Sequence, residues 1–342
     1  MRRGTEKWTR AGALVIAGLT ASAACALDPP EFYSGKTVTV YVGYSAGGGY
    51  DLYARILARH LVKHLPGRPA VVVQNMPGAG SLKALEYLYS VAPKDGTAIG
   101  TFSRSLPIAP LLEPARYDGA KFRWLGSVVS DTSVCVASAA SPIKAWDDLF
   151  RTTFTAGGEG KGADPDVIAT LLKTVYGARV KLVTGYPGSA EIDLAMERGE
   201  VDGQCGISYS TIKSRHRDWI DQRKVNIIVQ AALKKDRDLP DVPLLPDLAK
   251  TERQKGIMRL MLAPQEMARP FAAPPDTPDD RFLALRAAFD RTTRDPEFVA
   301  EMKKQDLDLD PMPGAAIDAL LKGLYATPPD LLRAAAAALK TE

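Results

Sequence analysis

Residues 38–61 read VTVYVGYSAGGGYDLYARILARHL, and their pattern is the strongest indication of the fold class. Its first part, Val38 to Tyr44, is rich in β-branched and aromatic residues, which is typical of a strand. A glycine-rich turn follows, and from Leu52 to Leu65 apolar residues recur at helical spacing until Pro66 and Gly67 end the helix. A strand that turns tightly into a helix begins a β-α-β unit, so the stretch predicts a parallel sheet covered by helices.

The same alternation continues along the chain. Strands are predicted at 70–74 and 97–102 with a helix at 81–91 between them, and a second series of similar size runs from about 147 to 233. The segment from Phe122 to Ala137 predicts one long strand that runs from the first series into the second. Two such series predict an α/β protein of the two-lobed kind, each lobe a mainly parallel sheet with flanking helices around a cleft.

The lobes are not contiguous in this prediction. We assign residues 27–133 and 229–342 to the first lobe and residues 134–228 to the second. A chain of this length exceeds what one hydrophobic core usually holds, which favours two lobes. Helices predicted at 278–292, 296–304, 315–324 and 331–340 are expected to pack back on the first lobe.

The N-terminus has the pattern of a secretory signal peptide over residues 1–26. Basic residues (Arg2, Arg3, Lys7 and Arg10) precede an apolar run from Ala11 to about Leu19, and Ala24-Cys25-Ala26 offers cleavage before Leu27. The run is too short for a membrane-spanning helix, and cleavage before Cys25 as a lipoprotein is the alternative. This predicts a periplasmic protein. Removal of the leader takes Lys+Arg from 44 to 40 and Asp+Glu from 40 to 39, so no nucleic-acid partner is expected.

Two cysteines remain after that cleavage, Cys135 and Cys205. An even pair in an oxidising compartment predicts a disulfide, with two separate buried thiols as the alternative. Neither cysteine has a partner at metal-ligand spacing, and no metal or cofactor is expected.

Four loops that follow predicted strands are candidate ligand-binding loops. They are residues 45–49, 103–105, 157–162 and 185–189. Glycine lets the backbone approach a ligand closely, and the first turn of a helix offers unpaired N–H groups and a positive dipole end. Because ligands of parallel sheets bind beyond the carboxyl ends of the strands, these loops predict an anion site between the lobes.

Residues 43–47 also spell G-x-S-x-G, the nucleophile elbow of serine hydrolases, with Ser45 as the nucleophile. The motif lies on the first strand, where a hydrolase sheet would already need earlier strands. The triad also needs a late histidine, and the chain has only His60, His64 and His216. A secreted esterase is therefore kept as an alternative to a protein that is not an enzyme.

Two further patterns lead to no site. Gly158 to Ala163 fits G-x-G-x-x-A, but the next strand ends in Gly185-Tyr186 without the acidic residue that a dinucleotide ribose needs. His60 and His64 lie four apart on a helix without a completing Glu or Asp, so a solvated helix face is expected there.

The motifs taken together resemble the substrate-binding proteins of tripartite tricarboxylate transporters, also called Bug proteins. That family shows A-G-G-x-x-D, a helical A-R, E-N-x-P-G-A-G and P-D-G-Y-T. The corresponding segments here are Ala46–Asp51, Ala54-Arg55, Asn75–Gly80 and Lys94–Thr97. Further matches follow in order at 185–189, 198–203, 239–243 and 295–297, so the resemblance covers nearly the whole mature chain.

The resemblance implies a type II periplasmic binding protein that closes on a small carboxylate, a di- or tricarboxylate or an aromatic acid, and docks on membrane permease subunits. A sensor subunit for a receptor kinase would bind the same ligand. The second lobe departs from the family, because its loop S-P-G-N-G-S is replaced by 156–161 and the usual Lys after Tyr186 is Pro187. Arg104 and Lys161 are the cations available to a second carboxylate, with Lys161 expected to be solvated. The predicted ligand-binding residues are Ser45, Gly47, Gly48, Gly49, Asp51, Ser103, Arg104, Gly158, Glu159, Gly160, Tyr186, Gly188 and Ser189.

Overall fold

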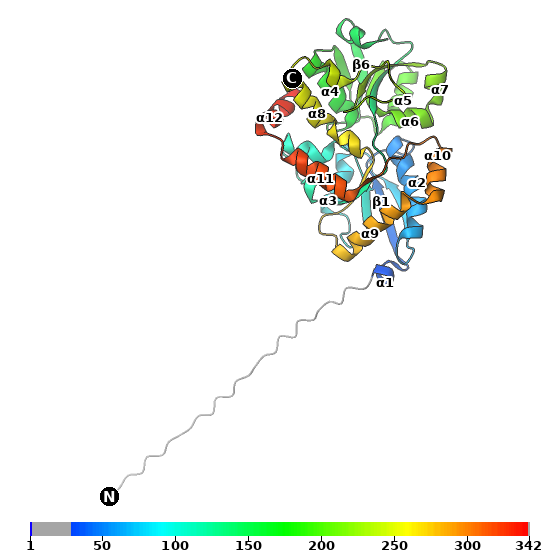
Figure 1. The fold of residues 1–342 in the computed structure, drawn as a ribbon, viewed down its shortest axis with the longest axis vertical. Helices are drawn as coiled ribbons and strands as arrows, with labels where there is room; N and C mark the ends of the chain where they lie inside the picture. The colour runs from blue at the N-terminus through cyan, green and yellow to red at the C-terminus, as the bar shows by residue number, and fades with distance from the viewer. Residues whose placement is uncertain (2–28, 341–342) are drawn as a thin grey trace.

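The computed structural model describes Met1 and residues 29–340 of the chain. These residues form two lobes, one above the other in the view of Figure 1, and each lobe is built on its own sheet. The predicted two-lobed α/β fold is confirmed. Apart from Met1, the predicted signal peptide lies outside the described residues and stays a prediction.

The first lobe contains a six-stranded sheet in the order β11-β4-β10-β3-β1-β2. Strand β1 pairs in parallel with β2 and β3, as the β-α-β pattern predicts. Strand β10 returns from the far end of the chain and pairs antiparallel with β3 and β4, and β11 pairs antiparallel with β4. The strands are β1 (Thr37–Val42), β2 (Ala70–Asn75), β3 (Ala98–Thr101), β4 (Arg123–Ser127), β10 (Pro270–Ala273) and β11 (Met312–Pro313).

Both faces of this sheet are covered by helices. Val38, Val40 and Val42 of β1 are buried in one cluster with α2, α9 and α10, while Tyr41 lies in the opposite cluster with α3 and α11. Burial on both faces explains the apolar run Val40 to Val42 in the second half of β1, whereas Thr37 and Thr39 lie in its less buried first half. The helices are α1 (Pro29–Tyr33), α2 (Gly49–His64), α3 (Leu82–Ser90), α9 (Asp279–Thr292), α10 (Pro296–Lys304) and α11 (Gly314–Tyr325).

The second lobe contains a five-stranded sheet in the order β7-β6-β8-β5-β9. Strand β6 pairs in parallel with β7 and β8, and β5 pairs antiparallel with β8 and β9. Each sheet thus combines a parallel set of three strands with antiparallel neighbours. The prediction of mainly parallel sheets is corrected to mixed sheets, because β10 and β5 enter their sheets antiparallel to the strands beside them. The strands are β5 (Ser133–Ser138), β6 (Phe154–Gly157), β7 (Val180–Val183), β8 (Gly203–Ser208) and β9 (Val225–Ala231).

Helices also cover both faces of the second sheet. One buried cluster joins it to α4, α8 and α12, and the other joins it to α5, α6 and α7. The helices are α4 (Asp164–Tyr176), α5 (Ser189–Glu197), α6 (Tyr209–Arg215), α7 (Arg217–Asp221), α8 (Glu252–Leu262) and α12 (Pro329–Ala338). Short 3-10 helices are η1 (Ala79–Ser81), η2 (Leu106–Leu111), η3 (Gly119–Lys121), η4 (Trp146–Phe150), η5 (Leu245–Leu248) and η6 (Ala263–Met267).

Two segments run side by side between the lobes. The outgoing segment, 128–132, links β4 to β5, and the returning segment, 265–269, leads into β10. Backbone hydrogen bonds join them, from Val128 N to Arg269 O at 3.2 Å and from Asp131 N to Gln265 O at 3.2 Å. The segment 122–137, predicted as a single strand, does connect the lobes. The prediction of one continuous strand is wrong, because residues 128–132 lie between β4 and β5 and pair with the returning segment.

The C-terminal helices are divided between the lobes. Helices α9, α10 and α11 pack on the first lobe as predicted, but α12 packs against α8 and α4 of the second lobe. The prediction for the last helix is therefore wrong. Its apolar residues Ala334 and Ala335 find their burial against α8, a helix that the sequence reading did not anticipate. The residue boundaries between lobes, at 133/134 and 228/229, stay predictions.

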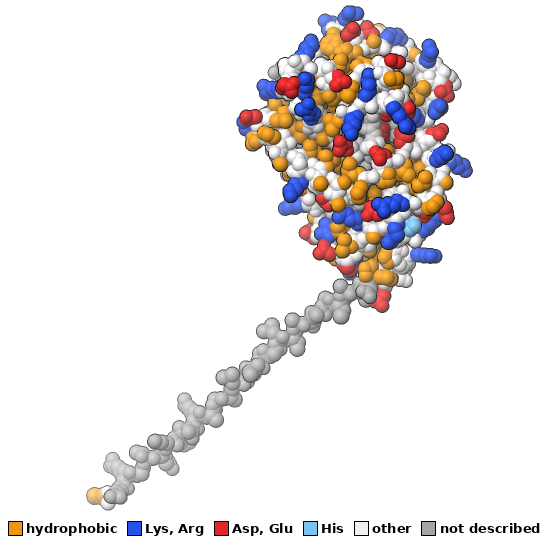
Figure 2. Space-filling model, viewed as in Figure 1, with side chains coloured by type: hydrophobic (Ala, Val, Ile, Leu, Met, Phe, Trp, Pro, Cys, Tyr) orange, Lys and Arg blue, Asp and Glu red, His pale blue; other side chains and the backbone are white. Residues whose placement is uncertain are grey.

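The surface of α2 also differs from the solvated face predicted for it. His60 is buried, and its Nε2 atom forms a hydrogen bond with Glu301 of α10 at 2.6 Å. The Nε2 atom of His64 forms one with Asp295, the residue before α10, at 2.8 Å. Over the face of both lobes seen in Figure 2, basic and acidic side chains are interspersed. Within the described residues, no helix has the length and apolar character needed to span a membrane.

Candidate ligand-binding site

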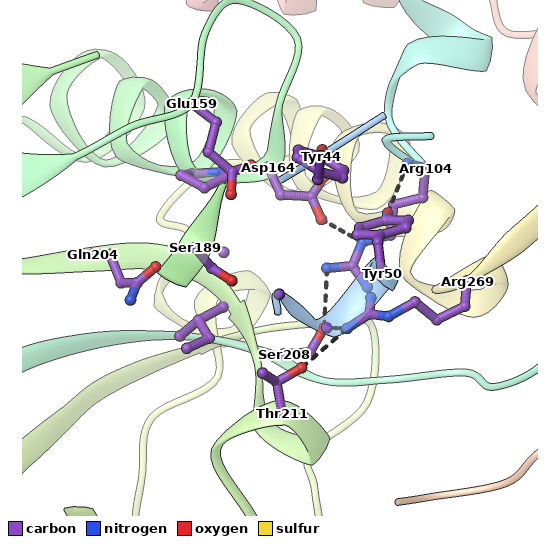
Figure 3. Close-up of a pocket in the computed structure, with 15 residues that line it drawn as sticks. Tyr44, Tyr50, Arg104, Glu159, Asp164, Ser189, Gln204, Ser208, Thr211 and Arg269 are labelled. Carbon is purple, nitrogen blue, oxygen red and sulfur yellow. Dashed lines mark hydrogen bonds and ion pairs between the residues drawn. The ribbon is translucent and has the colours of Figure 1, made fainter. Parts of the chain in front are cut away.

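A small cavity lies between the lobes, beyond the carboxyl ends of β1, β6 and β8 (Figure 3). The cavity has a volume of about 40 Å³, which is room for roughly three water molecules. Both lobes and the returning segment contribute to it. The lining consists of Tyr44, Gly48, Gly49, Tyr50, Arg104, Glu159, Asp164, Pro165, Ser189, Gln204, Gly206, Ile207, Ser208, Thr211 and Arg269.

The first glycine-rich loop is held by Asp51, one turn into α2. Its carboxylate accepts hydrogen bonds from Gly47 N at 2.8 Å, from Arg55 Nε at 2.9 Å and from Asn75 Nδ2 at 2.8 Å. Burial opposes the charge on Asp51, but these hydrogen bonds outweigh it and lower the pKa of the carboxyl. Asp51 therefore shapes the loop and does not line the cavity.

The start of α2 faces the cavity at Gly48 and Gly49. A Cβ atom on Gly49 would lie 2.5 Å from Thr211 Oγ1 and 2.9 Å from Arg269 Nη2, so any larger residue would displace these two side chains. The absence of a side chain lets Arg269 reach the helix start. Backbone N–H groups at this end of a helix favour an anion.

Arg269 is the central positive group of the cavity. It is 3% exposed, and its guanidinium stacks 4.5 Å from the ring centre of Tyr50. Its Nη2 donates to Ser208 Oγ at 2.9 Å and Thr211 Oγ1 at 3.2 Å, whereas its buried Nε has no acceptor in the described part of the chain. No described carboxylate forms an ion pair with it. A buried charge without a counterion is costly, and an anionic ligand would offset that cost.

Arg104, in contrast, is already neutralised. It is 1% exposed, forms an ion pair through Nε with Asp164 at the start of α4, and donates from Nη2 to Ser133 Oγ at 2.8 Å. Burial by itself lowers the pKa of Arg104, but Asp164 outweighs it and raises that pKa above its usual range. Arg104 thus differs from the free cation that the sequence suggested, although its Nη1 has no acceptor among the described residues.

The second glycine-rich loop carries negative charge. Asp166 accepts hydrogen bonds from the backbone N–H groups of Glu159 at 2.7 Å and Gly160 at 2.9 Å, so these groups are not available to a ligand. The Glu159 side chain reaches the cavity (Figure 3). Burial, reinforced by Asp164, Asp166 and Asp193, raises the pKa of Glu159 well above its usual value.

The lobes touch around the cavity. Gly80 N of the first lobe donates to Glu159 O of the second at 3.1 Å, and Ser103 Oγ donates to Gly162 O at 3.2 Å. A Cβ atom on Gly80 would lie 2.7 Å from Gly160 O, so two facing glycines permit this contact. The lobes are therefore closed on each other beside the cavity.

Ser45 lies at this lobe contact and not beside a histidine. Its Oγ donates to Glu191 Oε2 at 2.8 Å, and its backbone N donates to Pro187 O at 3.3 Å. The three histidines each pair with a carboxylate elsewhere, His60 with Glu301, His64 with Asp295 and His216 with Asp193. No histidine is among the described hydrogen-bond partners of Ser45, so the Ser-His pair expected of a nucleophile elbow is not formed there.

Of the predicted ligand-binding residues, the structure brings Gly48, Gly49, Arg104, Glu159 and Ser189 to the cavity lining. The others lie in the same loops but outside the lining, namely Ser45, Gly47, Asp51, Ser103, Gly158, Gly160, Tyr186 and Gly188. Sequence reasoning missed Arg269, Ser208 and Thr211. The available signal for Arg269 was a lone basic residue at the start of an apolar strand, in Met267-Ala268-Arg269-Pro270.

The structure also bears on the two cysteines, on the metal-ligating side chains and on Lys161. The sulfur atoms of Cys135 and Cys205 lie 2.04 Å apart on the neighbouring strands β5 and β8, at bonding distance. Within the described residues, no group of three or more metal-ligating side chains is assembled. Lys161 is exposed and pairs with Glu113 across the lobe boundary.

Two α/β lobes joined by the segments 128–132 and 265–269, with a polar cavity between the carboxyl ends of their strands, are the architecture of the solute-binding proteins. Residues 53–320 match the tripartite tricarboxylate transporter family receptor, and the chain belongs to this family. The resemblance seen in the sequence is thereby confirmed.

Individual relatives agree with this assignment. The chain is 25% identical over 303 residues to a "UPF0065 protein in gbd 5'region" of Cupriavidus necator, covering 86% of both chains. It is similar to the periplasmic binding protein BugD with a TM-score of 0.68 and 22% identity, covering 88% of this chain and 96% of BugD. It is also similar to MatC from Rhodopseudomonas palustris with bound malate, with a TM-score of 0.67 and 20% identity, covering 87% and 99%. These likenesses establish the fold.

Proposed function

We propose that this protein is an exported receptor that captures a small carboxylate between its lobes and delivers it to the permease of a tripartite tricarboxylate-type transporter. The observation that carries the proposal is Arg269, a buried guanidinium at the cavity without a carboxylate partner among the described residues. The hydroxyl groups of Ser208 and Thr211 and the first N–H groups of α2 surround the same space. The malate bound to MatC supports a carboxylate as the ligand class.

The proposed mechanism uses the outgoing segment, 128–132, and the returning segment, 265–269, as the hinge between the lobes. With the lobes apart, a carboxylate can reach the start of α2 and Arg269; closure then adds Ser189, Gln204 and Ser208 from the second lobe. Charge-assisted hydrogen bonds made in the closed form pull the equilibrium toward closure by their differential free energy. The closed receptor then presents both lobes together to a membrane partner.

A thermal-shift screen tests the ligand class. Mature protein is heated with mono-, di- and tricarboxylates, aromatic acids, amino acids and neutral sugars. A ligand at a hundred times its Kd stabilises the fold by about 2.7 kcal/mol, which is readily measured. Stabilisation by a neutral sugar and by no carboxylate would sink the anion assignment.

The role of Arg269 is tested by Arg269→Met. Removal of a buried charged partner of a ligand costs about 2–5 kcal/mol, so the Kd for the carboxylate should rise by about 30-fold or more. Arg253→Met is the matched control, because Arg253 is exposed on α8 and makes none of the cavity contacts. Equal affinity of Arg269→Met and wild type for the carboxylate would contradict the site.

The membrane partner separates transport from sensing. Cells that lack this protein should lose uptake of the radiolabelled carboxylate and regain it with the wild-type chain but not with Arg269→Met. Normal uptake in its absence, with loss of a transcriptional response to the carboxylate, would instead favour the sensor subunit.

Mass spectrometry of the exported protein should give an N-terminus at Leu27, as the signal peptide predicts.

A further inference from the structure

One side chain of the cavity lining, Gln204, is held from behind by residues that lie outside the lining. Gln204 belongs to β8 and is fully buried. Its Nε2 atom donates a hydrogen bond to Asp193 Oδ1 at 2.6 Å and lies 3.7 Å from Met196 Sδ, a weak acceptor. Asp193 and Met196 are on α5, and neither lines the cavity. The N–H groups of the Gln204 amide are therefore directed away from the ligand.

The chemistry of Asp193 fixes which way this amide turns. An ionised carboxylate only accepts hydrogen bonds, so the amide presents its nitrogen to Asp193 and its oxygen to the opposite side. Figure 3 shows the oxygen of Gln204 turned toward Ser189. This oxygen, Oε1, is buried and has no hydrogen-bond partner within the described residues. A buried carbonyl oxygen is costly to leave without a donor, so Oε1 is an acceptor for a bound molecule.

Asp193 is fixed in turn by His216. Asp193 is 4% exposed, and its second oxygen, Oδ2, lies 2.8 Å from His216 Nε2. The ring of His216 stacks on the buried ring of Trp219, with the ring centres 4.1 Å apart. A series of contacts thus runs from the junction of α6 and α7 through Asp193 to the amide of Gln204.

The backbone that carries Gln204 is also held firmly. Strand β8 lies inside its sheet, where Gln204 is paired with Val136 of β5 and with Gly157 of β6. The next residue, Cys205, is bonded to Cys135 of β5. A side chain on an inner strand keeps its geometry when a second set of hydrogen bonds supports it. The orientation of the amide therefore depends on Asp193.

We infer that Asp193 and His216 are positioning residues for ligand binding: they hold the amide of Gln204 so that its oxygen, and not its nitrogen, faces the ligand. The inference rests on the proposed function, in which Arg269 binds the carboxylate. Gln204 then distinguishes one carboxylate from another. An acid that places a hydroxyl group at Oε1 forms a hydrogen bond there, whereas its analogue without the hydroxyl leaves a buried acceptor without a donor.

Titration calorimetry of the mature protein tests the acceptor with matched acids. Both enantiomers of malate are compared with succinate, and both enantiomers of lactate with propionate, so that each comparison changes only a hydroxyl group. Wild type should bind at least one hydroxylated acid about 10-fold or more tightly than its plain analogue. Gln204→Met removes the acceptor at similar size and should abolish this preference. Retained binding of the plain acid shows that the variant is folded.

The positioning role is tested by Asp193→Leu, which removes the carboxylate at similar volume. It should lose as much of the preference as Gln204→Met does. The double variant should lose no more than either single variant, because Asp193 acts through Gln204. The acids of one comparison carry the same charge at neutral pH, so an altered charge around Glu159 cancels in the ratio of their Kd values.

Two further variants separate positioning from a general structural effect. His216→Gln keeps a donor near the position of Nε2 and should retain the preference, whereas His216→Leu should lower it by about 3-fold or more. Glu197→Gln is the control, because Glu197 is exposed on α5 and does not line the cavity. It should behave as wild type.

The orientation of the amide can also be measured without a ligand. In a proton–nitrogen NMR spectrum, the amide signals of Gln204 are assigned by their loss in Gln204→Met. Their exchange with solvent should be about 10-fold or more slower in wild type than in Asp193→Leu, because a hydrogen-bonded amide exchanges only when the bond opens.

Four results overturn the inference and leave the receptor standing. Wild type could bind carboxylates of the thermal-shift screen without binding any hydroxylated acid more tightly than its plain analogue. Asp193→Leu could keep the preference, or the double variant could lose more than Gln204→Met, which would give Asp193 a general structural role. The Gln204 amide could exchange equally fast in wild type and Asp193→Leu. Failure of every carboxylate to bind wild type removes the proposed function instead, and the exchange rates then decide the orientation alone.

Discussion

The two glycine-rich loops at the cavity look alike in sequence and differ in what they offer a ligand. Each follows a strand and precedes a helix, at 45–49 in the first lobe and 157–162 in the second. In the first lobe, Asp51 binds Gly47 and leaves the helix start open at Gly48 and Gly49. In the second lobe, Asp166 occupies the loop N–H groups and Glu159 adds a carboxyl. The same backbone motif therefore differs in which of its N–H groups are already occupied, depending on where the nearest carboxylates lie.

Asp164→Asn gives the largest expected effect and tests the second loop. It leaves Arg104 buried without its counterion, and loss of one partner of a buried ion pair costs about 3–5 kcal/mol in the free energy of unfolding. Urea denaturation measures this. The double variant Arg104→Met/Asp164→Asn removes both charges and should recover most of the loss, because the cost lies in the unpaired charge. A loss below about 1 kcal/mol in the single variant would show that Asp164 and Arg104 are not a buried pair.

The disulfide concerns the sheet that carries the second loop. Cys135 and Cys205 are 70 residues apart, and closing a loop of that length stabilises the fold by on the order of 4 kcal/mol. Cys135→Ala/Cys205→Ala should lower the free energy of unfolding by about this amount, less any strain. Wild type treated with a reductant should match it. Two free thiols in the oxidised protein, counted by mass spectrometry after alkylation, would contradict the bond. The first lobe has no cysteine among the described residues. Amide hydrogen exchange in that lobe should therefore be the same with and without a reductant.

The smallest effect belongs to the first loop, where Asp51→Ala removes the hydrogen bonds to Gly47 and Asn75. Loss of these hydrogen bonds to a buried carboxylate costs about 1–2 kcal/mol in the free energy of unfolding. The pKa of Asp51 is lowered in the folded protein, so its contribution is present above its unfolded pKa of about 4 and disappears as the pH falls through the lower folded value. Wild type and variant should therefore differ at pH 7 and converge at acidic pH. Asp330→Ala, at an exposed pair with Arg333, is the control and should change stability by less than about 0.5 kcal/mol. If the difference in the free energy of unfolding between wild type and variant grew as the pH fell, the pKa of Asp51 would not be lowered in the folded protein.

Much of the fold could be predicted from the sequence because its cause is local. Val38, Val40 and Val42 alternate with residues of the other face, and the apolar spacing of 52–65 is helical, so both elements follow from periodicity. The break at 128–132 could not be predicted, because its hydrogen-bond partners at 265–269 are more than a hundred residues away. For the same reason α12 was placed on the wrong lobe: its composition favours helix and says nothing of which helix buries it.

For the binding site, the positions of the loops and of their glycines could be predicted from the sequence. Glycine-rich turns between strand and helix are a local property, and the order of motifs fixed the family. Which charged side chains have a partner depends on contacts between distant parts of the chain. The tertiary structure pairs Arg104 with Asp164 across the lobes and brings Arg269 beside Gly49, although 220 positions separate them in the numbering. Ion pairing in a buried site depends on distances of a few ångströms, and such distances arise only when residues far apart in the chain are folded together.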